Sequence, residues 1–135
     1  FKLNSNILSL GILYLITFGV YMFFEYFGIN KRSVSITGYL EASYPSSTTI
    51  LVLCFMITSI YQTNKYCIKI HNRVALIIIQ ALFIIFMVIG RILSGVHWLT
   101  DIVGGIIISI SLINMYQFFD LLINNYQKRA QYLIE

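Results

Sequence analysis

The stretch VALIIIQALFIIFMVIG, residues 74–90, decides the fold class of this protein. It contains no charged residue, and Gln80 is its one strongly polar side chain. A helix needs roughly 20 mainly apolar residues to cross a bilayer core about 30 Å thick, with about 17 as the lower limit. Residues 74–90 therefore predict a transmembrane helix.

Three further segments have the same character, namely residues 7–24, 47–62 and 102–119. Their β-branched residues favour strands in water, but inside lipid the backbone groups must find partners within their own segment. The alternating pattern of a membrane barrel strand is absent. The sequence therefore predicts an all-α fold, a polytopic membrane helical bundle with four transmembrane helices, in which residues 1–135 form a single membrane-embedded domain.

The composition excludes several other classes of protein. Hydrophobic residues make up 59% of the 135 residues and charged residues only 10%, against roughly 25% charged in a soluble domain. A soluble enzyme and a disordered tail are thereby excluded. The net charge of +4 comes from scattered Lys and Arg residues, so no basic stripe indicates a nucleic-acid partner. Cys54 and Cys67 fit neither a disulfide framework nor a metal site. No feature indicates an oligomeric state.

The basic residues predict the orientation of the bundle. Four spans place linkers 28–46 and 91–101 on one side of the membrane, and linker 64–73 with both termini on the other. The first side holds Lys31, Arg32 and Arg91, and the second holds Lys2, Lys65, Lys69, Arg73, Lys128 and Arg129. Because the side richer in Lys and Arg is cytoplasmic, we expect a multi-pass cell-membrane protein whose linkers 28–46 and 91–101 face outward.

The two outward linkers carry polar side chains that are unusual in so apolar a protein. In the first linker these are Lys31, Arg32, Glu41, Tyr44 and the run PSSTT at 45–49, and in the other they are Arg91, Ser94, His97 and Asp101. Two distant stretches thus bring cations, hydroxyls, an imidazole and a carboxylate to the same membrane face. This convergence predicts a functional site there.

Ser46 stands before an apolar run and is a plausible helix N-cap. The N–H groups of Ser47 and Thr48, together with the positive end of the helix dipole, would then form an anion site. Arginines nearby are suited to gripping a phosphate with two hydrogen bonds. The alternative is that Ser46 merely caps the helix and that the arginines lie among lipid headgroups.

His97 and Asp101 are four residues apart, a spacing that places both on one face of a helical turn. A carboxylate bound to one imidazole nitrogen fixes the tautomer and leaves the other nitrogen free to attack or to bind a proton. The alternative is a structural histidine beside an Asp101 that caps the fourth helix.

The sequence of residues 90–101, GRILSGVHWLTD, resembles the third signature, SRxxxxxHxxxD, of the type 2 phosphatidic acid phosphatase superfamily, with Gly90 in place of the serine. Residues 44–49, YPSSTT, resemble its second signature, PSGH. Arg32 falls where the first signature, KxxxxxxRP, would end, with Glu25 at the lysine position and Ser33 at the proline position.

This resemblance implies a helical membrane enzyme that removes phosphate from lipid phosphates or diphosphates without a metal or cofactor. His97 would be the nucleophile that forms a phosphohistidine, and Asp101 would orient it. The phosphoryl oxygens would be held by Arg32, Arg91, Ser46 and the backbone of Ser47. Its partners would be the lipid substrate and the bilayer. The family usually has six spans, so we expect two more to precede Phe1.

Thr48 stands where the second signature has the histidine that protonates the leaving group. A threonine hydroxyl cannot give up a proton at useful pH, and general acid catalysis contributes about 10²- to 10⁴-fold. Glu25 adds negative charge at the position of a phosphate-binding lysine unless Lys31 compensates for it. Glu41 or Tyr44 is a candidate for supplying the proton to the leaving group.

Two interpretations of the departure at Thr48 follow. The protein is either a phosphatase with altered substrate demands or a catalytically silent relative that binds lipid phosphate or scaffolds membrane partners. A channel or transporter fragment is disfavoured, because the polar residues gather at one membrane face rather than along the helices.

Overall fold

The computed structural model describes residues 5–27, 43–67 and 69–132, and these form four helices. In chain order they are α1 (Ser5–Phe27), α2 (Ser47–Tyr66), α3 (Ile70–Leu93) and α4 (Leu99–Tyr132). None of the described residues forms a strand. The prediction of an all-α fold with four helices is therefore confirmed.

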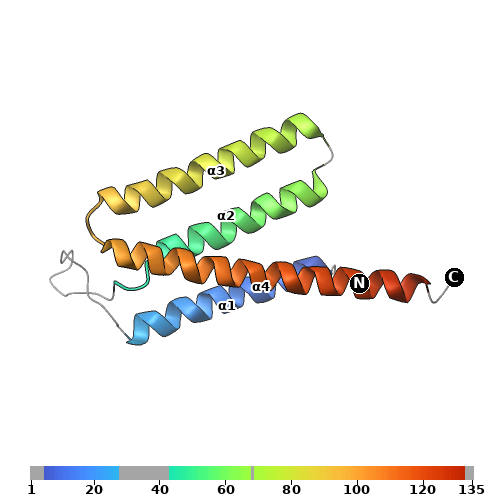
Figure 1. The fold of residues 1–135 in the computed structure, drawn as a ribbon, viewed down its shortest axis with the longest axis horizontal. Helices are drawn as coiled ribbons and strands as arrows, with labels where there is room; N and C mark the ends of the chain where they lie inside the picture. The colour runs from blue at the N-terminus through green and yellow to red at the C-terminus, as the bar shows by residue number, and fades with distance from the viewer. Residues whose placement is uncertain (1–4, 28–42, 68, 133–135) are drawn as a thin grey trace.

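The four helices run alternately up and down (Figure 1). The segment that leads into α2 and the turn between α3 and α4 lie at one end of the bundle, whereas the connection between α2 and α3 lies at the other. α2 packs against all three other helices, while α3 packs mainly on α2. This arrangement brings residues 43–46 and 94–98 to the same end of the bundle, as the sequence predicts for linkers 28–46 and 91–101.

Three of the helices are long and apolar enough to cross a membrane, over the ranges Asn6–Phe27, Ile70–Leu93 and Leu99–Tyr126. α2 is not in this group, although the sequence predicts a span there. Its hydroxyl groups lower its hydropathy, and the structure turns two of them inward, since Thr49 and Thr58 are buried. Thr58 donates a hydrogen bond to the Cys54 carbonyl oxygen at 2.6 Å.

The described core lies where α1, α2 and α4 meet. Its buried members are Leu13, Ile50, Cys54, Leu112, Ile113 and Tyr116. In contrast, α3 has no buried residue, and large side chains such as Ile79 and Phe86 are exposed along it. Apolar side chains that lie open on a spanning helix are suited to contact with lipid tails.

The connections between helices are shorter than the sequence predicts. α3 continues to Leu93 and α4 begins at Leu99, so the connection is residues 94–98 rather than 91–101. The other connection is residues 67–69 rather than 64–73. At two of these ends the charge suits the helix dipole, since Arg91 lies in the last turn of α3 and Asp101 in the first turn of α4.

Two glycines of α4 allow the chain before α2 to lie directly on that helix. A Cβ atom at Gly104 would lie 2.5 Å from Cε2 of Tyr44, and one at Gly105 would lie 3.2 Å from the Ser46 carbonyl oxygen. The Ser46 N–H donates to the Asp101 carbonyl oxygen at 3.0 Å. Because glycines occupy these two positions, residues 43–46 can pack directly against the start of α4.

Candidate functional site

The turn between α3 and α4 positions His97. Gly95 has a φ of +64°, a left-handed conformation that glycine adopts without steric cost and that commonly ends helices. The Ser94 N–H donates to the Gly90 carbonyl oxygen at 2.9 Å and so closes the last turn of α3. The chain then reverses, and His97 is 7% exposed beside the segment that leads into α2.

The His97 imidazole is held through its Nδ1 atom. Nδ1 lies 3.2 Å from the Ser43 carbonyl oxygen and 3.3 Å from the Ser43 hydroxyl. The Asp101 Oδ2 atom lies 3.6 Å from the same nitrogen. Because a carbonyl oxygen only accepts hydrogen bonds, the contact with Ser43 requires the proton on Nδ1. In the neutral imidazole the lone pair is then on Nε2.

Asp101 is completely buried and binds several groups at once. Its Oδ2 atom accepts hydrogen bonds from the Ser43 hydroxyl and, at 3.0 Å, from the Trp98 N–H. The bond from Trp98 is the N-terminal capping contact in which a carboxylate three residues into a helix accepts from the residue before it. Asp101 therefore caps α4, as one of the two alternatives from the sequence predicts, and its carboxylate also lies close to His97.

His97 precedes α4 and is not part of a helical turn. The expectation that a helix places His97 and Asp101 on one face is therefore wrong in its mechanism, although the two side chains do meet. They meet because the turn at Gly95 and the contacts of Ser43 fold the imidazole back over the start of α4. Sequence reasoning missed Ser43 altogether, since a serine three residues before Ser46 follows no spacing rule.

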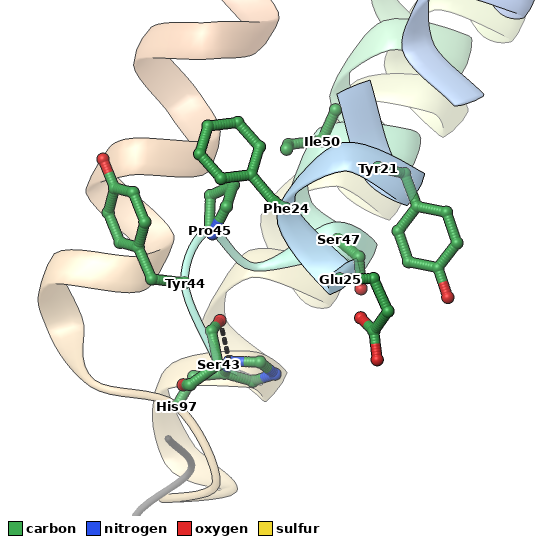
Figure 2. A pocket seen from close by; sticks show the side chains of 9 residues that line it. All are labelled: Tyr21, Phe24, Glu25, Ser43, Tyr44, Pro45, Ser47, Ile50 and His97. Carbon is green, nitrogen blue, oxygen red and sulfur yellow. Dashed lines mark hydrogen bonds between the residues drawn. The ribbon is translucent and has the colours of Figure 1, made fainter. Parts of the chain in front are cut away.

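A small cavity of about 10 Å³ lies beside the imidazole, which is space for about one water molecule. Its walls come from the end of α1, from the segment that leads into α2 and from the turn before α4 (Figure 2). The lining residues are Tyr21, Phe24, Glu25, Ser43, Tyr44, Pro45, Ser47, Ile50 and His97. Tyr44 and Ser47, two candidates from the sequence, thus share a cavity with His97.

Ser46 lies at the N-cap of α2, as predicted, but its side chain does not cap the helix. Its hydroxyl accepts a hydrogen bond from the Thr49 hydroxyl at 3.0 Å, and its N–H binds the Asp101 carbonyl oxygen. Ser46 is fully buried, so its structural role is to join α2 to α4. Ser47, the first residue of α2, lines the cavity with the helix N-terminus behind it.

Arg91 lies away from the cavity, on the contact between α3 and α2. Its Nη2 atom donates to the Thr48 hydroxyl oxygen at 2.6 Å. Neither Arg91 nor Thr48 is among the described residues that line the cavity. The guanidinium therefore contacts the first turn of α2 at a residue that does not line the cavity. Lys31, Arg32 and Glu41 lie outside the described residues.

These observations define a helical membrane protein with a buried histidine and carboxylate pair at one end of its bundle. The family model of the PAP2 superfamily matches residues 14–123. The chain therefore belongs to the PAP2 superfamily, and the resemblance drawn from the signature residues is confirmed. No curated protein and no solved structure matches the chain.

The hydrogen bond between Ser43 and Asp101 leads to a prediction about stability. Replacing Ser43 with alanine removes a donor to a buried carboxylate, so we expect Ser43→Ala to lower the free energy of unfolding by about 1–3 kcal/mol. Ser94 is the matched control, because its exposed hydroxyl binds only the Arg91 carbonyl oxygen in the described contacts. Ser94→Ala should change stability by less than about 0.5 kcal/mol. Thermal unfolding in detergent measures both, and equal losses would contradict the role of Ser43.

Proposed function

We propose that this protein is a membrane phosphatase that hydrolyses a lipid phosphate or diphosphate through a phosphohistidine formed on His97. Members of the PAP2 superfamily are generally phosphatases, which supports a hydrolase. The observation that carries the proposed mechanism is the buried imidazole whose Nδ1 atom contacts the Ser43 carbonyl oxygen and faces Asp101. Binding alone does not need a histidine held in one tautomer.

In the first half of the proposed reaction, Nε2 of His97 attacks the phosphorus atom. The bond between phosphorus and the leaving oxygen breaks, and the electron pair departs with that oxygen. The imidazole gains positive charge as the phosphorus–nitrogen bond forms. Asp101 Oδ2 at 3.6 Å from Nδ1 stabilises this charge, because burial strengthens the attraction between opposite charges. The step uses only groups of the chain and needs no metal.

The phosphoryl group also needs positive charge around its oxygens. The start of α2 supplies N–H groups that have no acceptor within the helix, and Ser47 brings this end of the helix to the cavity. We assign Arg91 a supporting part, because its guanidinium contacts the same first turn through Thr48. Arg32 is proposed as the second phosphate-binding arginine on the signature resemblance alone.

The alternative, a catalytically silent relative that binds lipid phosphate or scaffolds membrane partners, is favoured by one observation. The Thr48 hydroxyl accepts a hydrogen bond from Arg91, and a threonine does not replace the general acid histidine. Turnover separates the two proposals, since a silent relative binds a lipid phosphate without releasing inorganic phosphate.

We further propose that the His97 end of the bundle faces away from the cytoplasm, on the count of basic residues. Ser94 is exposed in the connection 94–98, and Asn64 is exposed near the connection 67–69 at the other end of the bundle. In a chain with Cys54 and Cys67 replaced by alanine, Ser94→Cys should react with an impermeant thiol reagent on intact cells, and Asn64→Cys should not. The reverse pattern would overturn this orientation.

The nucleophile is tested by measuring phosphate release from a panel of lipid phosphates and diphosphates. His97→Ala should abolish release and the acid-labile phosphoprotein, because no nitrogen remains to attack. Asp101→Asn should lower kcat on the order of 10²- to 10⁴-fold, since a neutral amide does not stabilise the positive charge that the imidazole gains in the first step. His71→Ala is the control, because His71 is exposed at the start of α3. Full activity in His97→Ala would rule out the assignment.

Thr48 leads to a prediction about the substrate. An alkoxide leaving group is the conjugate base of an alcohol, which is about as weak an acid as water, whereas a phosphate leaving group has a second pKa of about 6. A site without a general acid should therefore favour lipid diphosphates, such as a polyprenyl diphosphate, over monophosphates.

Thr48→His should raise kcat/KM for a monophosphate more than for the diphosphate with the same lipid chain. Thr48→Ala is the control, since it also removes the contact with Arg91 but adds no proton donor. A wild-type preference for the monophosphate, or equal gains on both substrates, would show that another group already supplies the proton.

A further inference from the structure

Glu25 is a carboxylate in a place where simple electrostatics disfavours one. It lies in the last turn of α1, where the negative end of the helix dipole repels an acidic side chain by about 0.3–1 kcal/mol. It also lines the cavity into which a phosphoryl group, itself negative, is proposed to enter. No described residue binds its carboxylate in a hydrogen bond or an ion pair. A structural role among the described residues therefore does not account for it.

The cavity places this carboxylate opposite the nucleophile. Glu25 comes from the end of α1 and His97 from the turn before α4, and both side chains border the same cavity (Figure 2). Glu25 is exposed whereas His97 is buried, so the carboxylate lies nearer to solvent than the imidazole on the border of this cavity.

We propose that Glu25 is the general base that activates water in the second half of the reaction. This inference rests on the proposed function. The oxygen of the water attacks the phosphorus atom of the phosphohistidine, while the Glu25 carboxylate takes the proton that the water loses. The bond between phosphorus and Nε2 breaks, and its electron pair returns to the imidazole. Inorganic phosphate leaves, and Glu25 gives its proton to the solvent.

The role of a base agrees with the departure at Thr48. A base is needed after the leaving group has gone, so it does not replace the missing acid, and the diphosphate preference remains. The negative charge of Glu25 also repels the negatively charged substrate and so weakens its binding. Removing the carboxylate should therefore lower kcat, because the base is lost, and lower KM, because the repulsion is lost.

The experiment uses purified protein and a polyprenyl diphosphate with a radiolabelled terminal phosphate. Glu25→Gln keeps the size of the side chain and removes the base. We expect its kcat to fall about 10²- to 10⁴-fold, its KM to fall, and an acid-labile phosphohistidine to accumulate after a rapid release of the first product. Glu25→Asp should recover part of the kcat, because it restores a carboxylate.

Tyr26→Phe is the neighbouring control, since Tyr26 is 86% exposed and does not line the cavity. It should match the wild type in kcat, KM and labelling. His97→Ala gives the background of the labelling measurement.

The outcomes separate the inference from the proposed function. If the wild type hydrolyses the lipid and Glu25→Gln is as active or more active, with no trapped phosphohistidine, Glu25 only repels the substrate and the inference is overturned while the function stands. A wild type that releases no phosphate from the lipid panel overturns the function and the inference with it.

Discussion

The buried carboxylate of Asp101 is the group on which the rest of the described site depends. Its side chain accepts hydrogen bonds from Ser43 and from the Trp98 N–H, and its carbonyl oxygen accepts one from the Ser46 N–H. One residue thus joins the segment before α2, the turn after α3 and the first turn of α4. A buried charge is costly unless several donors satisfy it, so these three segments are held in one arrangement.

That arrangement determines what the imidazole can do. With Ser43 and Asp101 on the Nδ1 side, the reactive nitrogen is Nε2. Gly104 and Gly105 allow the segment that carries Ser43 to approach α4 closely, and the fully buried Ser46 fixes the start of α2 beside it. The chemistry proposed for His97 therefore depends on the packing of backbone against backbone as much as on the signature side chains.

Much of this structure can be predicted from the sequence because the bilayer imposes strong rules. Apolar segments of sufficient length predict the four helices, and the signature spacing finds His97 and Asp101. The burial of Thr49 and Thr58 within α2, in contrast, is something that hydropathy along one segment cannot reveal.

The contacts that hold the site escaped prediction because they join residues distant in sequence. The pairing of Ser43 with Asp101, the contact of Arg91 with Thr48 and the presence of Glu25 in the same cavity as His97 all depend on how the helices pack. Arg91 shows the limit most clearly. The signature groups it with His97, yet its guanidinium binds a hydroxyl outside the cavity.

The tautomer of His97 tests the central claim most directly. The chain has two histidines, at positions 71 and 97, so a His71→Gln variant with nitrogen-labelled histidine leaves one imidazole to observe by NMR. The account predicts a neutral ring with the proton on Nδ1 and none on Nε2. A neutral ring with the proton on Nε2 would contradict it, because that nitrogen would then have no lone pair with which to attack phosphorus.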